Sequence, residues 1–104
     1  HMNTIVVEYR PHPDRVDENQ GLAEEVFAEL AATEPGGIRY ATWRLADGTF
    51  VHIAELESDA NPLSANAAFQ RFQQGIVDRC EGGAPPNPRA ATLVGAYRFS
   101  PSHA

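Results

Sequence analysis

The stretch IRYATWRLADGTFVHIAEL, residues 38–56, decides the fold. Both halves are rich in β-branched and aromatic residues, and the Asp-Gly pair at 47–48 between them is typical of a β-hairpin. A two-residue turn there pairs Trp43 with His52 and places both on the more apolar face. A three-residue turn with a bulge over 46–48 would shift this register by one residue. We favour the two-residue turn because it separates apolar from polar side chains cleanly.

The segments on either side of the hairpin predict two more strands and two helices. Residues 4–10 are β-branched and aromatic, which predicts a strand, and 14–32 carry apolar residues at helical spacing with acids on the other face. A second helix is predicted over 61–80 and a last strand over 91–99. The order β-α-β-β-α-β predicts one ferredoxin-like α+β domain over residues 3–100. Its antiparallel sheet has the strand order 4-1-3-2, with both helices on one face.

Composition limits the partners. The formal net charge is −6, from 14 acids against 8 bases, and all the bases are arginine, which together with the many alanines suggests a bacterium with a GC-rich genome. No basic stripe is present, so nucleic acid and anionic membranes are not expected partners. No apolar run is long enough to span a membrane, and Cys80 is the only cysteine, so we expect a cytoplasmic protein. His1 is expected to be a tag remnant and 101–104 a C-terminal tail.

The sheet face that points away from the helices is expected to mix apolar and charged side chains. Val6, Ile53 and Val94 share it with charged residues such as Glu8 and Arg98. Such a face is more apolar than a surface in contact with solvent and carries more charge than a hydrophobic core. A second copy of the same sheet would cover it, which predicts a homodimer; the alternative is a solvated antiparallel face.

Several aromatic and polar side chains are candidates for a pocket under the helices. His52 is the candidate base because its unperturbed pKa is about 6.5; the alternative is a buried neutral histidine bonded to a neighbour. For the aromatic candidates the alternative is core filling, and for the two asparagines it is a partner at a helix end. No metal-ligand spacing is present. The candidate ligand contacts are Trp43, Tyr9, Tyr97, Asn66, Asn19, Phe69 and Phe72.

Three segments resemble a known family. EYRPHPD at 8–14, IRY at 38–40 and AFQRF at 68–72 are similar to the antibiotic-biosynthesis-monooxygenase-like group of dimeric α+β barrels. The resemblance implies a homodimer whose two sheets form a barrel, with a ligand pocket between sheet and helices in each subunit. Members include cofactor-independent oxygenases of aromatic polyketides and haem-degrading enzymes, and others have no known activity.

The haem-degrading members of that group use a strand asparagine together with a tryptophan and a histidine on the second helix. The counterpart of the asparagine here is Val7, and residues 61–68 contain neither tryptophan nor histidine. Haem degradation is therefore not expected, nor is any other cofactor. The resemblance favours a cofactor-independent monooxygenase-like protein that acts on or binds a small apolar aromatic molecule, with His52 as base. The alternative is a non-catalytic ligand-binding or structural homodimer.

Overall fold

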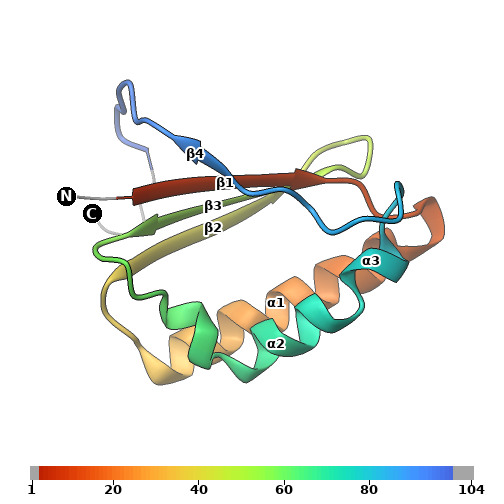
Figure 1. The fold of residues 1–104 in the computed structure, drawn as a ribbon, viewed down its shortest axis with the longest axis horizontal. Helices are drawn as coiled ribbons and strands as arrows, with labels where there is room; N and C mark the ends of the chain where they lie inside the picture. Colours follow the sequence, from red (N-terminus) through yellow and green to blue (C-terminus); the bar gives the residue numbers. More distant parts are fainter. Residues whose placement is uncertain (1–2, 100–104) are drawn as a thin grey trace.

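Four antiparallel strands form the sheet in the computed structural model, which describes residues 3–99 (Figure 1). The predicted tag residue and the predicted tail at 101–104 lie outside the described residues. The strand order is β2-β3-β1-β4, which confirms the predicted order read from the other edge. The strands are β1 (Asn3–Tyr9), β2 (Ile38–Arg44), β3 (Phe50–Leu56) and β4 (Arg89–Ala91).

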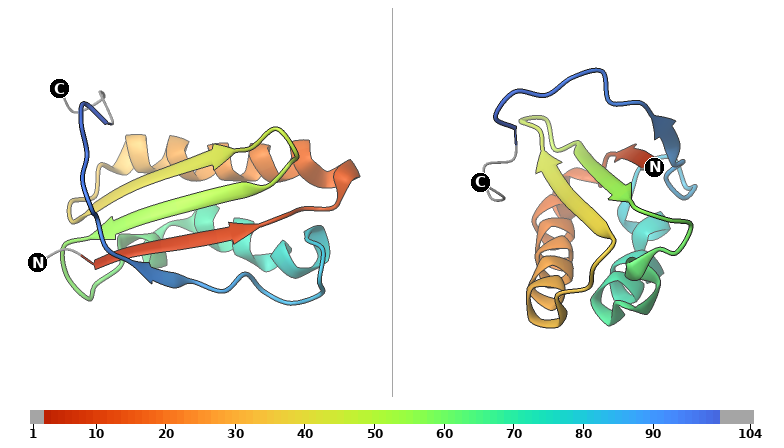
Figure 2. Two further views of the ribbon diagram at one scale, coloured as in Figure 1. Left: turned by 90° about the horizontal axis from the view of Figure 1, so that it is seen from above. Right: turned by 90° about the vertical axis from the view of Figure 1, so that its left-hand side faces the viewer.

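The helices of the described residues lie on one face of this sheet, and no helix covers the other, which we call the open face (Figures 1 and 2). The helices are α1 (Val16–Thr33), α2 (Ala67–Gln74) and α3 (Ile76–Arg79), with short 3₁₀ turns η1 (Pro13–Arg15) and η2 (Pro62–Ala65). Within residues 3–99, no helix is both long enough and apolar enough to cross a membrane.

The predicted second helix over 61–80 is divided into three pieces. The Asn61 side chain accepts a hydrogen bond from Leu63 N at 2.9 Å and starts η2, and Asn66 accepts one from Phe69 N at 2.7 Å and starts α2. Each asparagine is the N-cap of a new helical segment, so the chain does not form one continuous helix from 61 to 80. Gly75 separates α2 from α3, since glycine is a poor helix former.

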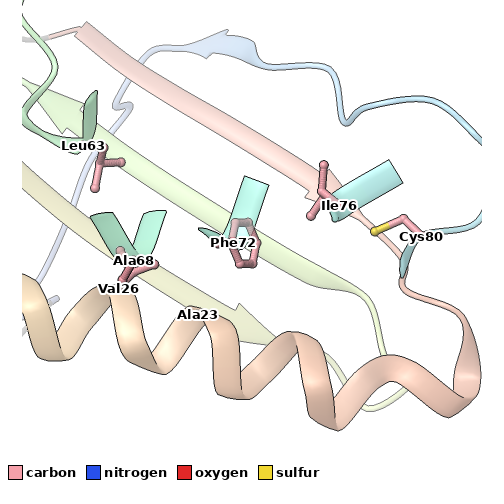
Figure 3. Close-up of a cluster of buried hydrophobic side chains, with 7 residues drawn as sticks. All are labelled: Ala23, Val26, Leu63, Ala68, Phe72, Ile76 and Cys80. Atoms are coloured by element: carbon pink, nitrogen blue, oxygen red, sulfur yellow. The ribbon is translucent and has the colours of Figure 1, made fainter. Parts of the chain in front are cut away.

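The core lies between the sheet and the two helical segments (Figure 3). Along β3 every second side chain is buried, which is the expected alternation for a sheet covered on one face. The buried apolar cluster between α1 and the α2–α3 segment consists of Ala23, Val26, Leu63, Ala68, Phe72, Ile76 and Cys80.

The hairpin has a three-residue turn, so the predicted two-residue turn is wrong. Leu45 N donates to Thr49 O at 2.8 Å, and Gly48 N donates to Leu45 O at 3.0 Å. Gly48 has a φ of +92°, the left-handed conformation that the bulged turn requires. The Asp47 carboxylate accepts a hydrogen bond from Thr49 N at 2.9 Å, which stabilises the turn.

This turn shifts the register of β2 by one residue. Thr42 lies opposite His52, and Trp43 lies opposite Val51. Because side chains alternate along a strand, the shift moves Tyr40 and Thr42 to the helix-covered face and Trp43 to the open face. The faces predicted for β1 and β3 are unaffected and are confirmed.

The last strand is much shorter than the predicted 91–99. β4 pairs antiparallel with β1 from Arg89 opposite Val6 to Ala91 opposite Thr4. Since β1 begins at Asn3, the chain after Ala91 has almost no partner strand left. Residues 92–99 instead cross the open side of the sheet toward β2 (Figure 2).

Gly48 tests the turn. An alanine at this positive φ is strained, and its Cβ would lie 3.3 Å from Val16 Cγ2. We expect Gly48→Ala to lower the free energy of unfolding by about 1–2 kcal/mol. The matched control is Gly36→Ala, whose Cβ would have no neighbour within 4 Å and which should leave stability unchanged or slightly higher. Urea unfolding of both variants gives the comparison, and equal stabilities would contradict the bulged turn.

Candidate functional site

His52 is the centre of a hydrogen-bonded cluster on the covered face of the sheet. Its side chain is buried in the middle of β3. Nε2 lies 2.6 Å from Tyr9 Oη on β1. Nδ1 lies 2.7 Å from Tyr40 Oη and 2.9 Å from Thr42 Oγ1, both on β2. Three adjacent strands therefore supply one imidazole and three hydroxyl groups.

The imidazole and the three hydroxyl groups carry no net charge at neutral pH. Burial lowers the pKa of His52 from 6.5 to about 4, so the imidazole is neutral. Burial also raises the pKa of Tyr40 to about 12. The pKa of Tyr9 is likewise raised by burial, against the opposing effect of a hydrogen bond from Asn19. Both phenols therefore keep their protons.

Two further polar residues stand behind Tyr9. Asn19 on α1 is fully buried, and its Nδ2 donates to Tyr9 Oη at 2.9 Å. Arg79 at the end of α3 is 2% exposed, and its Nε donates to Asn19 Oδ1 at 3.0 Å. The cluster thus continues from the sheet to both helical segments.

A cavity of about 440 Å³ opens beside His52, between the sheet and the α2–α3 segment. The cluster contributes three side chains to the wall of this cavity, those of His52, Tyr9 and Tyr40. Most of the remaining wall is apolar. The volume is in the range of small-molecule sites. The cavity is lined by Ile5, Val7, Tyr9, Tyr40, His52, Ala54, Asn61, Leu63, Phe69, Phe72, Gln73, Ile76, Val77, Pro85, Pro86 and Pro88.

The structure brings together part of the set of candidate residues named from the sequence. His52, Tyr9, Phe69 and Phe72 line the cavity. Asn19 touches the cluster from behind Tyr9 without lining the cavity. The buried Asn66 side chain caps α2, which is the helix-end role that we weighed as its alternative.

Trp43 and Tyr97 lie elsewhere, and the shared cavity expected for Trp43 and His52 is wrong. Trp43 is on the open face, 40% exposed, with its ring centroid 5.8 Å from that of Phe99. Tyr97 is 83% exposed in the segment after β4. The bulged turn displaces Trp43, and the early end of β4 displaces Tyr97.

Three residues of the cluster were not predicted from the sequence, Tyr40, Thr42 and Arg79. The three-residue turn, which we considered, would have placed Tyr40 and Thr42 beside His52. The signal for Arg79 was its spacing, because it follows Ile76 by three residues on a buried helical stripe. Within residues 3–99, no group of three or more His, Cys, Asp or Glu side chains could hold a metal ion.

Comparison with known proteins identifies the fold. No protein-family model and no curated protein matches the sequence. A "putative antibiotic biosynthesis monooxygenase" from Nitrosomonas europaea aligns over 90% of this chain and 91% of its own, with 15% identity and a TM-score of 0.70. One of the same name from Caulobacter crescentus aligns over 90% and 91%, with 18% identity and a TM-score of 0.69.

A third solved structure is a dimeric ferredoxin-like protein of unknown function from Jannaschia. It aligns over 89% of this chain and all of its own, with 16% identity and a TM-score of 0.67. The chain has the fold of these three proteins. The ferredoxin-like fold is therefore confirmed, and the family resemblance read from the sequence agrees with the names of these structures at the level of fold.

The lowered pKa of His52 makes stability depend on pH. Between about 4 and 6.5 the unfolded chain binds a proton at this histidine and the folded chain does not. The contribution of His52 is complete above pH 6.5 and is lost as the pH falls toward 4, by up to about 3 kcal/mol.

Two measurements test this dependence. Proton NMR titration should give a His52 pKa near 4, and urea unfolding between pH 4 and 7 should show a dependence of stability on pH that is weaker in His52→Gln. Exposed carboxylates contribute their own slope to both proteins, so the difference between the two curves isolates the histidine. A His52 pKa near 6.5 would contradict a buried neutral ring.

Proposed function

We propose that this protein binds a small, flat, mostly apolar molecule in the cavity and acts on it as a cofactor-independent monooxygenase, with His52 as the base. The single observation that carries the proposal is a buried imidazole, bonded to hydroxyl groups, at the edge of a cavity of about 440 Å³. A neutral imidazole can accept a proton, whereas an imidazolium cannot. The names of the structural relatives support the same reaction class.

The wall of the cavity favours an aromatic ligand with its polar group on one edge. Phe69 and Phe72 stack at 6.2 Å between centroids on the helical side. The hydroxyls of Tyr9 and Tyr40 lie together at the His52 end. A ligand with an apolar ring and one acidic hydroxyl or C–H group would match both parts.

The chemistry would require little from the protein beyond a base and a dry cavity. A substrate with an acidic C–H next to a carbonyl gives up a proton to His52 Nε2 through the Tyr9 hydroxyl. The resulting carbanion reduces O₂, so that a CH₂ group becomes C=O and the second oxygen atom leaves as water. Tyrosine hydroxyls that donate to the substrate oxygen would stabilise its negative charge.

Binding and turnover can be measured with simple probes. We expect 1-naphthol to shift the NMR signals of Phe69, Phe72 and His52, and to bind about 5 to 10 times more tightly than naphthalene because of its hydroxyl hydrogen bond. Replacing both Tyr9 and Tyr40 with phenylalanine should remove that preference, because it removes the hydroxyls that would bond the naphthol oxygen. Equal binding of both probes to the unmodified protein, or no shift at the cavity, would contradict the proposed site.

Anthrone tests the reaction, since it has an acidic CH₂ group and yields anthraquinone and water with O₂. We expect the protein to accelerate O₂ uptake and anthraquinone formation, and His52→Leu to remove most of the acceleration. Binding of 1-naphthol with no acceleration of anthrone oxidation would favour the alternative, a non-catalytic ligand-binding homodimer.

The proposal includes a homodimer formed through the open face. Val6, Val51 and Ile53 lie on that face, each only partly buried. The segment that crosses it leaves Leu93 and Val94 66% and 100% exposed. A second copy would cover these apolar side chains and complete a barrel of two sheets. Cys80 is free and buried, which suits the reducing cytoplasm that we expect.

Ile53 tests this interface. Ile53→Asp places a charge at the centre of the open face, where a partner sheet would bury it unpaired, so the variant should be monomeric. Ala31→Asp adds the same charge to the exposed side of α1 and should stay dimeric. Light scattering at micromolar concentration distinguishes them, and an unchanged mass for Ile53→Asp would contradict the proposed interface.

A further inference from the structure

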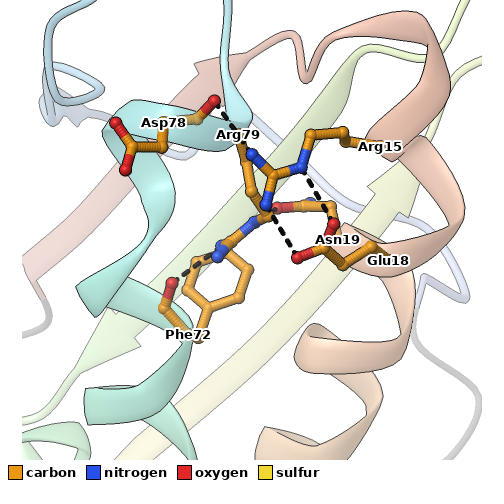
Figure 4. A network of polar contacts seen from close by, with 6 residues as sticks. All are labelled: Arg15, Glu18, Asn19, Phe72, Asp78 and Arg79. Atoms are coloured by element: carbon orange, nitrogen blue, oxygen red, sulfur yellow. Dashed lines mark hydrogen bonds and ion pairs between the residues drawn. The ribbon is translucent and has the colours of Figure 1, made fainter.

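Arg79 is a buried cation for which packing alone gives no reason. Its guanidinium donates to Asn19 Oδ1 and to Phe72 O, at 3.0 and 2.7 Å, and lies 4.9 Å from the centroid of the Phe72 ring (Figure 4). Among the residues that the structure describes, no carboxylate lies within ion-pair distance of it. Burying an unpaired charge is costly, so an apolar side chain would serve the core better.

The contact between Arg79 and Asn19 sets the direction of the next hydrogen bond. Arginine can only donate, so the atom that it contacts on Asn19 must be the amide oxygen. The amide nitrogen is then the atom that faces Tyr9, and it donates to Tyr9 Oη at 2.9 Å. The Tyr9 oxygen accepts this bond, and its own hydrogen is left to donate elsewhere.

The nearest acceptor for that hydrogen is His52 Nε2, at 2.6 Å. A neutral imidazole has one N–H and one lone pair, so donation by Tyr9 places the lone pair on Nε2 and the hydrogen on Nδ1. Nδ1 then donates to Tyr40 Oη or Thr42 Oγ1, which lie at 2.7 and 2.9 Å. In this chain of hydrogen bonds from the Arg79 guanidinium to β2, each group donates to the next one. Hydrogen bonds aligned in this way polarise and strengthen one another.

We propose that Arg79 and Asn19 are positioning residues that fix the tautomer of His52, with the hydrogen on Nδ1 and the lone pair on Nε2. The importance of this tautomer for catalysis rests on the proposed function. Nε2 faces Tyr9, which lines the cavity, so the Tyr9 hydroxyl would relay a substrate proton to Nε2. The positive charge of Arg79 and the Asn19 bond both favour negative charge on the Tyr9 oxygen during that transfer.

Asn19→Asp tests the direction of the chain with almost no change of shape. A carboxylate can still pair with Arg79, but it accepts from Tyr9 where the amide donated. The Tyr9 oxygen is then open to accept from Nε2–H, so the His52 ring should switch to the Nε2–H tautomer. In protein labelled with ¹⁵N-histidine, the ring nitrogen shifts report which nitrogen carries the hydrogen, and His52→Gln assigns the signals.

We expect the Nδ1–H form to dominate by about tenfold or more in the unmodified protein, and the ratio to reverse in Asn19→Asp. Gln20→Glu is the matched control. It makes the same amide-to-carboxylate change one residue further along α1, where Gln20 bonds Arg44 and not the cluster. It should keep the original tautomer.

The proposal is overturned if the unmodified protein holds the Nε2–H form, or if a folded Asn19→Asp variant keeps Nδ1–H. If circular dichroism shows that this variant does not fold, the tautomer of His52 in the unmodified protein is the deciding measurement. The measurement needs no ligand. Failure of 1-naphthol to bind while the Nδ1–H tautomer is present would therefore count against the proposed function only.

Discussion

The pairing of Thr42 with His52 across β2 and β3 is the constraint on which the site depends. It follows from one glycine in a left-handed conformation, which lengthens the hairpin turn to three residues. A shift by one residue would turn Tyr40 and Thr42 to the open face and leave Nδ1 of a buried imidazole without either hydroxyl. Such an unsatisfied group costs about 1–3 kcal/mol, so the cluster and the turn support each other.

The cluster shows how a polar site can be kept inside a small apolar core. Each buried polar side-chain atom in residues 3–99 has a hydrogen-bond partner. The partners come from β1, β2, α1 and α3, so the site ties the sheet to both helical segments. The cluster supplies polar groups to one part of the cavity wall, while Phe69, Phe72 and three prolines, Pro85, Pro86 and Pro88, supply apolar surface to it. This separation is what a ligand with one polar edge would require.

Much of the fold could be predicted from the sequence, because alternation and helical spacing are strong signals in β1, β3 and α1. The predictions that were wrong, the register of β2 and the length of β4, concern features that depend on contacts between residues distant in sequence. The Asp-Gly pair fits either turn length, and the choice depends on the buried partners of His52. The end of β4 depends on where β1 begins, which a pattern within 91–99 cannot reveal. His52 and Tyr9 were predicted on the covered face of the sheet, and Phe69 and Phe72 on the apolar stripe of the second helix. Arg79 was missed because the sequence does not show that Asn19 lies close enough to accept a hydrogen bond from it.

A crystal structure with bound 1-naphthol tests the central claim most directly, that the His52 end of the cavity is a ligand site. We expect the naphthol ring to lie between Phe69 and the sheet, with its oxygen about 2.6–3.0 Å from the hydroxyl of Tyr9 or Tyr40. The same crystal would reveal whether two open sheet faces meet. A cavity closed by its own side chains, with naphthol absent or bound only on the surface, would contradict the account.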